Sequence, residues 1–351
     1  MKHDTMKAVL LTGFGGYDKL EYREDVAIPE PQKDEVLIKV SACGVNNTDI
    51  WTREGAYGDL QDGQAVSGWR GGGIEFPRIQ GADIVGYIVG IGPRVSSSRI
   101  GQRVLVNPTL YGRTTDDPPY TGFIGSEKDG GFAEFACAPA ENAHKIDSPL
   151  SDEQLATFMC AYLTAEHMLN RAGLKKTETI IVTGASGGVG SALVQLAKLR
   201  RANVVAITGK GKERSLRELE ADAIVTRDEP DLHSAIRDKL GKTSIDVVAD
   251  VVAGPLVSGL LDLLGHRGRY VTAGAIANPY VTIDWRKIYL KQLDVLGSTL
   301  GTQKEAEDLI GYITLGKVKP LLASTYPLAQ IVQAQKDFKK KQYFGKLVIA
   351  P

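Results

Sequence analysis

The stretch TIIVTGASGGVGSALVQLAK, residues 179–198, decides the fold class of this chain. It joins a short β-branched strand pattern to a helical pattern through a turn that contains Gly184, Gly187, Gly188 and Gly190. Glycines in such a turn let the backbone approach a pyrophosphate closely, and the N-terminus of the next helix presents N–H groups to the phosphates. Because a second apolar strand, NVVAIT at 203–208, follows the helix, the context predicts a dinucleotide-binding βαβ unit.

The end of that second strand indicates which dinucleotide is bound. An acidic residue there would hold the ribose 2′-hydroxyl of NAD, but no Asp or Glu lies between Glu178 and Glu213. The strand runs into basic residues instead, and cations suit the extra charge of a 2′-phosphate. The sequence therefore predicts NADPH, although a solvated charged helix start is the alternative interpretation. The expected contacts are Ala185, Ser186, Gly187, Gly188, Val189 and Gly190 in the turn, and Thr208, Lys210, Lys212 and Arg214 beyond the second strand.

The surrounding pattern extends this unit into a domain. At 151 the chain enters a helical segment with a capping box, Ser151 and Gln154. From there to about residue 300, apolar strands alternate with helices, which is typical of a doubly wound parallel sheet. We expect this Rossmann domain to cover 151–301.

The first part of the chain has a different pattern of apolar residues. Short apolar runs separated by turn residues extend to about residue 150, and some alternate with period two, as in VLIKVSA at 36–42. Such patterns predict a mostly antiparallel β domain. The tail, 302–351, reads as helix, strand, helix and strand, and we expect it to complete this first domain. The predicted fold class is thus α/β, with one mostly-β domain and one doubly wound domain.

Composition agrees with a folded two-domain protein that acts on small molecules. The chain has 351 residues, of which 43% are hydrophobic and 24% charged. Its 42 Lys and Arg balance 42 Asp and Glu, so no net field favours nucleic acid or an anionic membrane. The three cysteines lie far apart, which indicates a reducing, cytoplasmic location. No apolar stretch approaches the length of a signal h-region or a membrane span.

Several further motifs stand out along the chain: CGVNNTD at 43–49, FPRIQGADIVGYIVGIG at 76–92, GQRVLV at 101–106, GGFAEF at 130–135 and FGKLV at 344–348. Together with the glycine-rich turn, they resemble the motifs of the medium-chain dehydrogenase/reductase superfamily. The resemblance implies a GroES-like catalytic domain at 1–150, completed by 302–351, beside a Rossmann NADP-binding domain at 151–301. It also implies a homodimer formed through the edge of the Rossmann sheet.

The zinc-dependent members of this superfamily hold a catalytic zinc with a Cys, a His and a Cys. Here the first of these positions matches Asn46, the His-containing motif is replaced by Gly81, Ala82 and Asp83, and Cys160 alone matches a ligand. The loop 107–130 also lacks the four cysteines of the superfamily's structural zinc site. We therefore expect no metal.

Without a Lewis acid, the developing negative charge must be spread in another way. A quinone or an α,β-unsaturated carbonyl spreads it by conjugation, so the sequence is similar to the zinc-independent quinone oxidoreductase branch. Two alternatives stay open. One is an alcohol or aldehyde dehydrogenase reaction without metal, and the other is a non-catalytic NADPH-binding protein with a regulatory or structural role.

The resemblance also implies site residues. The substrate cleft is expected between the domains, with Asn46, Thr48 and Asp49 on its catalytic wall; Thr48 matches a hydroxyl that relays a proton, and Asn46 would hydrogen-bond the substrate oxygen. The alternative is that Asn46 and Asp49 only satisfy backbone groups in a turn. The cofactor contacts implied by matched position are Thr164, Ala273, Gly274, Ser298, Thr299 and Lys346.

Overall fold

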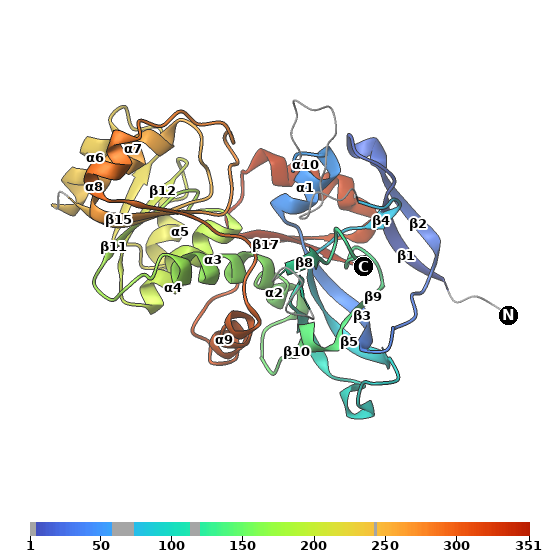
Figure 1. The fold of residues 1–351 in the computed structure, drawn as a ribbon. Coiled ribbons are helices and arrows are strands. Elements are labelled where there is room, and N and C mark those ends of the chain that lie inside the picture. Colours follow the sequence, from blue (N-terminus) through green and yellow to red (C-terminus); the bar gives the residue numbers. More distant parts are fainter. Residues whose placement is uncertain (1–4, 58–73, 113–119, 242–243) are drawn as a thin grey trace. The chain divides into compact units, whose positions relative to one another are not determined.

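The computed structural model describes residues 5–57, 74–112, 120–241 and 244–351. The chain divides into two compact units (Figure 1). Unit 1 comprises the chain up to Cys160 together with Pro320–Pro351, and unit 2 comprises Ala161–Lys319. Within the described residues, no helix is long and apolar enough to cross a membrane.

Unit 1 is built mostly from antiparallel strands. A seven-stranded sheet runs in the order β10-β6-β5-β3-β18-β17 with β9 also paired to β3, a three-stranded sheet runs β2-β1-β4, and β7 and β8 form a hairpin. The strands are β1 (Thr5–Leu11), β2 (Leu20–Ala27), β3 (Glu35–Gly44), β4 (Arg78–Ile79), β5 (Asp83–Ile91), β6 (Arg103–Val106), β7 (Thr109–Tyr111), β8 (Tyr120–Phe123), β9 (Phe135–Pro139), β10 (Ala143–Lys145), β17 (Leu322–Pro327) and β18 (Lys346–Ala350). The predicted mostly-β character of this unit is confirmed.

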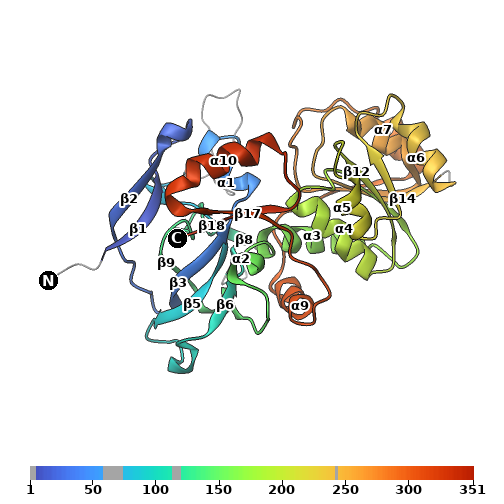
Figure 2. The ribbon, with the colours of Figure 1, turned by 180° about the vertical axis from the view of Figure 1, so that it is seen from behind.

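The core of unit 1 follows from the period-two pattern of β3. Val36, Ile38 and Val40 are buried in the apolar core while Lys39 between them faces solvent. Three helices accompany the sheets: α1 (Asn47–Glu54), α2 (Asp152–Leu155) and α10 (Ile331–Lys340). Helix α10 lies beside α1 in both views (Figures 1 and 2), where the buried Arg53 donates from Nε to Oε1 of Gln335 at 3.0 Å.

Unit 2 contains the predicted doubly wound sheet. Its six strands are parallel and run in the order β13-β12-β11-β14-β15-β16. Helices cover both faces, with α3 and α4 on one side and α6, α7 and α8 on the other (Figure 1). The strands are β11 (Thr179–Val182), β12 (Asn203–Thr208), β13 (Ala223–Thr226), β14 (Ile245–Asp250), β15 (Leu264–Thr272) and β16 (Asp294–Gly297). The helices are α3 (Met159–Arg171), α4 (Gly188–Leu199), α5 (Glu213–Glu218), α6 (Leu232–Leu240), α7 (Leu256–Leu263), α8 (Arg286–Lys291) and α9 (Gln303–Thr314).

The two units meet at 160/161 and 319/320, whereas the sequence-based domain boundaries lie at 150/151 and 301/302. The first difference arises because α2 packs on β3 and β5 of unit 1. Its predicted capping box is present, with the Ser151 hydroxyl accepting from the Gln154 N–H and the Gln154 side chain accepting from the Ser151 N–H.

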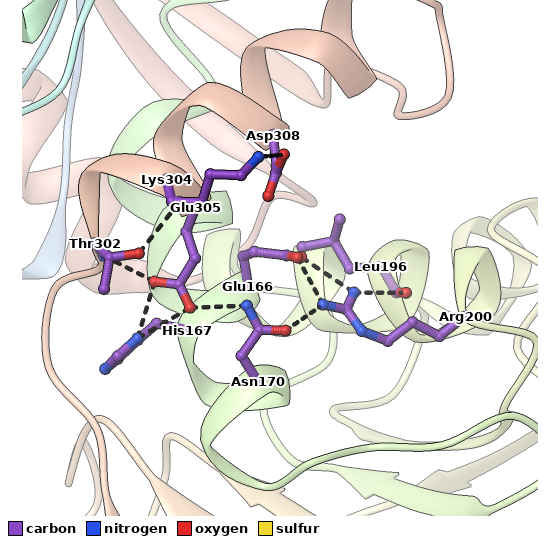
Figure 3. A network of polar contacts seen from close by, with 9 residues as sticks. All are labelled: Glu166, His167, Asn170, Leu196, Arg200, Thr302, Lys304, Glu305 and Asp308. Atoms are coloured by element: carbon purple, nitrogen blue, oxygen red, sulfur yellow. Dashed lines mark hydrogen bonds and ion pairs between the residues drawn. The ribbon is translucent and has the colours of Figure 1, made fainter.

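The second difference arises because a polar network holds α9 in unit 2 (Figure 3). The Glu305 carboxylate lies 2.9 Å from Nδ1 of His167 and accepts from Nδ2 of Asn170 at 2.7 Å. Arg200, the C-cap of α4, joins the same network through ion pairing with Glu166, with 2.6 Å between Nη2 and Oε1. Helices α3, α4 and α9 are thus tied together by side chains.

Candidate active site

The glycine-rich turn of unit 2 has the geometry that a pyrophosphate site needs. Gly187 is the N-cap of α4, and Gly184 has a φ of +56°, a conformation that favours glycine. A Cβ on Gly190 would lie 2.1 Å from the carbonyl oxygen of Gly184, so a larger residue cannot be accommodated without a shift of the turn. Strand, turn and helix therefore cross closely, and the first N–H groups of α4 are directed toward the carboxyl edge of the sheet.

The other cofactor contacts predicted for unit 2 gather mostly at that same edge. Thr208 ends β12, Ala273 and Gly274 follow β15, and Ser298 and Thr299 follow β16. The order of the strands reverses between β11 and β14, and such a switch point is where doubly wound sheets bind ligands. Thr164 is on α3, and Lys346 belongs to unit 1.

Two hydroxyls at this edge suit a bound cofactor. The Oγ1 atom of Thr208 and the Oγ atom of Ser298 are buried, and neither has a hydrogen-bond partner among the described residues. An unpartnered buried hydroxyl costs free energy unless a ligand or solvent group satisfies it. These orphaned atoms, together with the glycine turn, fit a dinucleotide laid along the strand ends.

The basic residues beyond β12 differ in how exposed their side chains are and in which residues they contact. Arg214 is directed along its own helix, because its side chain is 91% exposed and pairs with Glu218 four residues later. Lys210 is exposed, while Lys212 is half-buried. Burial and the nearby charge of Arg227 lower the pKa of Lys212.

Arg227 is a candidate that sequence reasoning missed. Its N–H donates to the carbonyl oxygen of Thr208 at 2.8 Å, and its guanidinium lies 4.0 Å from the place where a Cβ on Gly209 would stand. It thus stands at the end of β12, beside Lys212. The signal was available in principle, since Arg227 directly follows the β13 strand pattern and parallel strands end at one edge.

A buried carboxylate braces the same edge and was also missed. Asp250, which ends β14, accepts from the hydroxyls of Thr183 and Tyr270 and from the N–H of Val252 at 2.8 Å. Burial and the Asp250 charge raise the pKa of Tyr270, so this phenol stays a donor at neutral pH. The bonds hold the turn after β14 rigidly against the turn that begins at Gly184.

In unit 1, the three predicted catalytic residues lie at the start of α1. Asn46 is the N-cap, and its N–H donates to Oδ2 of Asp49 at 2.7 Å, as in a capping box. The turn-satisfying role that we kept as the alternative for Asp49 is therefore present. The Asn46 amide is also engaged, because Nδ2 donates to Gly44 O at 3.2 Å and to Oδ2 of Asp83 at 3.0 Å, while Oδ1 accepts from Lys346.

Asp49 is buried and titrates far from its usual range. Burial raises its pKa to about 7, even though the hydrogen bond from the Asn46 N–H and the charge of Lys346 act in the opposite direction. At neutral pH this carboxyl group is therefore partly protonated. Its role in catalysis stays a prediction.

Thr48 is the predicted catalytic residue whose side chain is least engaged. Its Oγ1 atom is buried and has no partner at hydrogen-bonding geometry within the described residues. It nevertheless lies near the phenol of Tyr57, where burial raises the pKa of the phenol and the Thr48 hydroxyl lowers it. The Tyr57 ring in turn meets the edge of Trp51, with 5.6 Å between ring centroids.

The positions matched to zinc ligands gather around Asp83. Its carboxylate accepts from the Cys160 N–H at 2.5 Å, from the Asn46 amide and from Nζ of Lys346 at 2.6 Å. Ala82, beside it, offers only a buried methyl group. Burial and the charge of Asp83 raise the pKa of the Cys160 thiol. Among the residues that the structure describes, no group of three or more His, Cys, Asp or Glu side chains is arranged to hold a metal ion.

Comparison with known proteins places these features in a family context. Residues 32–148 match the alcohol dehydrogenase GroES-like domain family, and 188–314 match the zinc-binding dehydrogenase family. Quinone oxidoreductase of Lama guanicoe is 31% identical over 98% of this chain and 97% of its own. Acryloyl-coenzyme A reductase of Metallosphaera sedula is 28% identical over 98% and 99%. A crystal structure from Sinorhizobium meliloti, provisionally named an alcohol dehydrogenase, is 51% identical with a TM-score of 0.95 over 99% and 97% of the two chains.

Proposed function

This chain belongs to the medium-chain dehydrogenase/reductase superfamily, in its quinone oxidoreductase-like branch, and we propose that it is an NADPH-dependent, zinc-independent reductase of quinones or α,β-unsaturated carbonyls. Membership makes the chain an oxidoreductase. The names of its relatives support a small, conjugated acceptor, since one reduces quinones and another acts on acryloyl-coenzyme A.

The proposal of NADPH over NADH depends on charge at the end of β12. Lys212 and Arg227 lie close together there, and Thr208 adds a buried hydroxyl without a partner. Arg227 also pairs with Asp228, with 3.8 Å between Nε and Oδ1, and a ribose 2′-phosphate would add charge and acceptor oxygens that suit both cations. When bound, NADPH supplies a hydride from its dihydronicotinamide ring and leaves as NADP⁺.

The observation that carries the choice of acceptor is the engagement of Asn46 at the position matched to a zinc ligand. Its oxygen accepts from an ammonium and its amide hydrogens bind Gly44 and Asp83. Side chains committed in this way do not suit a Lewis-acid metal that would stabilise an alkoxide, whereas an enone takes the hydride at its β-carbon and delocalises the electron pair onto its oxygen. One proton then completes the reduction, and Thr48, or a water that it orders, is proposed to deliver it.

Two further parts of the proposal concern assembly and location. We propose a homodimer formed through β16, an edge strand of the Rossmann sheet with an exposed Val295. Cys43, Cys137 and Cys160 form no disulfide within the described part of the chain, which supports a reducing cytoplasmic location.

A panel of acceptors tests the function. We expect the purified protein to oxidise NADPH with quinones, enones or enals, and to do so faster than NADH. Turnover of simple alcohols or aldehydes alone would favour the dehydrogenase alternative. Tight NADPH binding with no turnover of any acceptor would favour a regulatory or structural cofactor-binding protein.

Matched arginine variants test the cofactor proposal by binding alone. Titration calorimetry with 2′,5′-ADP and with 5′-AMP should give a preference for 2′,5′-ADP that Arg227→Ala reduces about tenfold, on the scale of one lost charge-assisted contact. Arg217→Ala serves as the control, because Arg217 is an exposed arginine on the same helix, α5, and is not among the predicted cofactor contacts. Equal affinity of the wild type for both nucleotides would contradict the NADPH proposal.

Replacement of Thr48 tests the proton source. Thr48→Val keeps the shape of the side chain and removes its hydroxyl, so we expect kcat to fall at least tenfold with unchanged NADPH affinity. An unchanged kcat would remove Thr48 from the mechanism.

A further inference from the structure

A buried lysine stands where β3 ends and α1 begins, and the register of three strands places it there. Strand β18 is antiparallel to β3 with Val348 opposite Gly44, and the Val45 N–H donates to Leu347 O at 2.9 Å. Lys346 is two residues before Val348, and its Nζ donates to Oδ1 of Asn46, which is two residues after Gly44. On the other side of β3, Asp83 of β5 is opposite Gly44. Residues distant in sequence are thus brought together by backbone pairing.

We call Lys346, Asp83 and Asn46 the Lys346 cluster. The ammonium of Lys346 donates to Oδ2 of Asp83 at 2.6 Å and to Oδ1 of Asn46, and Asn46 donates to Asp83 in turn. Lys346 is 4% exposed and Asp83 is fully buried. The cluster also needs the glycine beside it, because a Cβ on Gly44 would lie 2.9 Å from Oδ2 of Asp83 and 2.3 Å from Ala156 O.

Stability alone does not account for these charges. Burial lowers the pKa of Lys346, but the charge of Asp83 raises it above its usual value, so the ammonium is charged. Buried ion pairs repay their desolvation only in part, and apolar residues of similar volume are often as stable or more so. We therefore look for a role of the buried Lys346–Asp83 pair other than stabilising the fold.

The contacts of the cluster lead to the head of α1. The side chain of Asn46 is held by Lys346 and Asp83, and its backbone N–H binds the carboxylate of Asp49. The carbonyl oxygen of Asp49 accepts from Nε2 of Gln80 at 2.9 Å. Thr48 lies between these two anchored residues, in the first turn of α1, so the cluster determines where its hydroxyl stands.

We infer that Lys346 is a positioning residue for the reaction proposed above: its ammonium locks Asn46 against Asp83 and thereby holds the first turn of α1, with Thr48, in its working position. The inference rests on the proposed function for its catalytic part. It differs from the cofactor contact that the superfamily resemblance implies for Lys346, and the two roles make opposite predictions for NADPH affinity.

The experiment compares a charge-neutral variant with the wild type. Lys346→Met alone leaves the buried Asp83 carboxylate unpaired and is expected to unfold readily. The double variant Lys346→Met with Asp83→Asn removes both charges together and should fold. Lys340→Met is the control, because Lys340 is an exposed residue that pairs with Asp337 in its own helix. Each protein is assayed for thermal unfolding, NADPH affinity, kcat and KM, and amide hydrogen exchange.

The positioning role predicts that the double variant changes kcat and amide exchange in α1 but does not change NADPH affinity. The double variant should bind NADPH within twofold of the wild type, lose at least tenfold in kcat, and exchange the amides of residues 47–50 at least tenfold faster, with exchange in unit 2 unchanged. The control should match the wild type throughout.

Other outcomes overturn the inference. Unchanged amide exchange at residues 47–50 in the double variant would overturn the positioning role, whether or not the wild type turns over any acceptor. Failure of the wild type to turn over any acceptor would defeat the proposed function separately. A tenfold loss of NADPH affinity with unchanged kcat would assign Lys346 to the cofactor instead. A double variant with wild-type kcat would leave the buried pair with a structural role only.

Discussion

Asp49 shows how burial changes the chemistry of one side chain at the scale of single residues. Its pKa is raised to about 7 by burial, whereas a carboxyl group in an unfolded chain titrates near 4. Between these two values the folded protein binds more protons than the unfolded one. The free energy of unfolding contributed by this group is therefore complete below about pH 4 and is lost as the pH rises through about 7.

Asp49→Asn should remove this pH dependence. An asparagine oxygen can still accept from the Asn46 N–H, so the capping contact is kept while the titrating group is lost. We expect the variant to gain stability relative to the wild type between pH 5 and pH 8, by up to about 1.4 kcal/mol per pH unit. Denaturant unfolding at both pH values measures the change. If the free energy of unfolding changed with pH in the same way for both proteins, the raised pKa of Asp49 would be contradicted.

The sequence could predict some of these residues and not others. The glycines at 184–190 were predictable because one local segment carries the strand, the turn and the helix. The contact between Asp49 and the turn at Asn46 was also foreseen, as an alternative to a catalytic role, whereas the bond between Asn46 and Lys346 was not, because it joins positions 300 residues apart. Arg227 was missed because its closeness to Lys212 depends on the pairing of β12 with β13. Both contacts depend on which strands pair and in which register. Local sequence patterns do not directly give the pairing of strands that are distant in sequence.

At the scale of elements, local signals in the sequence predicted helices and strands of the tail. The capping box at Ser151 and the helix, strand, helix and strand of the tail are all present. The assignment of α9 to a unit, in contrast, depends on contacts of Glu305 with His167 and Asn170 of α3. The composition of a helix does not reveal such partners in advance.

Glu305 provides a prediction for this contact between elements. Burial alone would raise its pKa, but hydrogen bonds from His167, the Thr302 N–H and Asn170 lower it to about 2. Because the folded pKa lies below the unfolded one, the carboxylate stabilises the fold fully above about pH 4.5, and this contribution is lost as the pH falls toward 2.

Glu305→Gln should therefore be less stable than the wild type at pH 7, by about 1–3 kcal/mol, because a charged partner of the network is lost while glutamine can still complete the Thr302 capping box. The difference should narrow as the pH falls below 4.5. Thermal unfolding at several pH values measures it, and Glu307→Gln, an exposed change on the same helix, is the control. A stability difference between Glu305→Gln and the wild type that is as large at pH 3 as at pH 7 would contradict the stabilising role of the Glu305 carboxylate.

At the scale of the whole molecule, the surface of unit 2 bears on assembly. Strand β16 is an edge of the parallel sheet, and an edge strand presents unpaired backbone groups. Val295 on this strand is 49% exposed, and Trp285, Tyr289 and Leu290, on or next to α8, are more than half exposed. Exposed apolar side chains on an open edge strand, and on a helix of the same unit, are typical of an interface between protein chains. A second copy of the same chain satisfies both features at once, since symmetric edges can pair with each other.

Val295→Asp should therefore convert the proposed homodimer into monomers. A carboxylate at this position would be buried without a partner on pairing of two β16 edges, and two of them would face each other across the symmetry axis. Sedimentation velocity of the variant should give a single species near the 37.8 kDa mass of one chain. Ile100→Lys, at a residue 48% exposed on unit 1, is the matched control and should stay dimeric. If both variants sediment as the wild type does, pairing through β16 is refuted, and if the wild type itself is monomeric, the exposed apolar residues of α8 and β16 require another occupant.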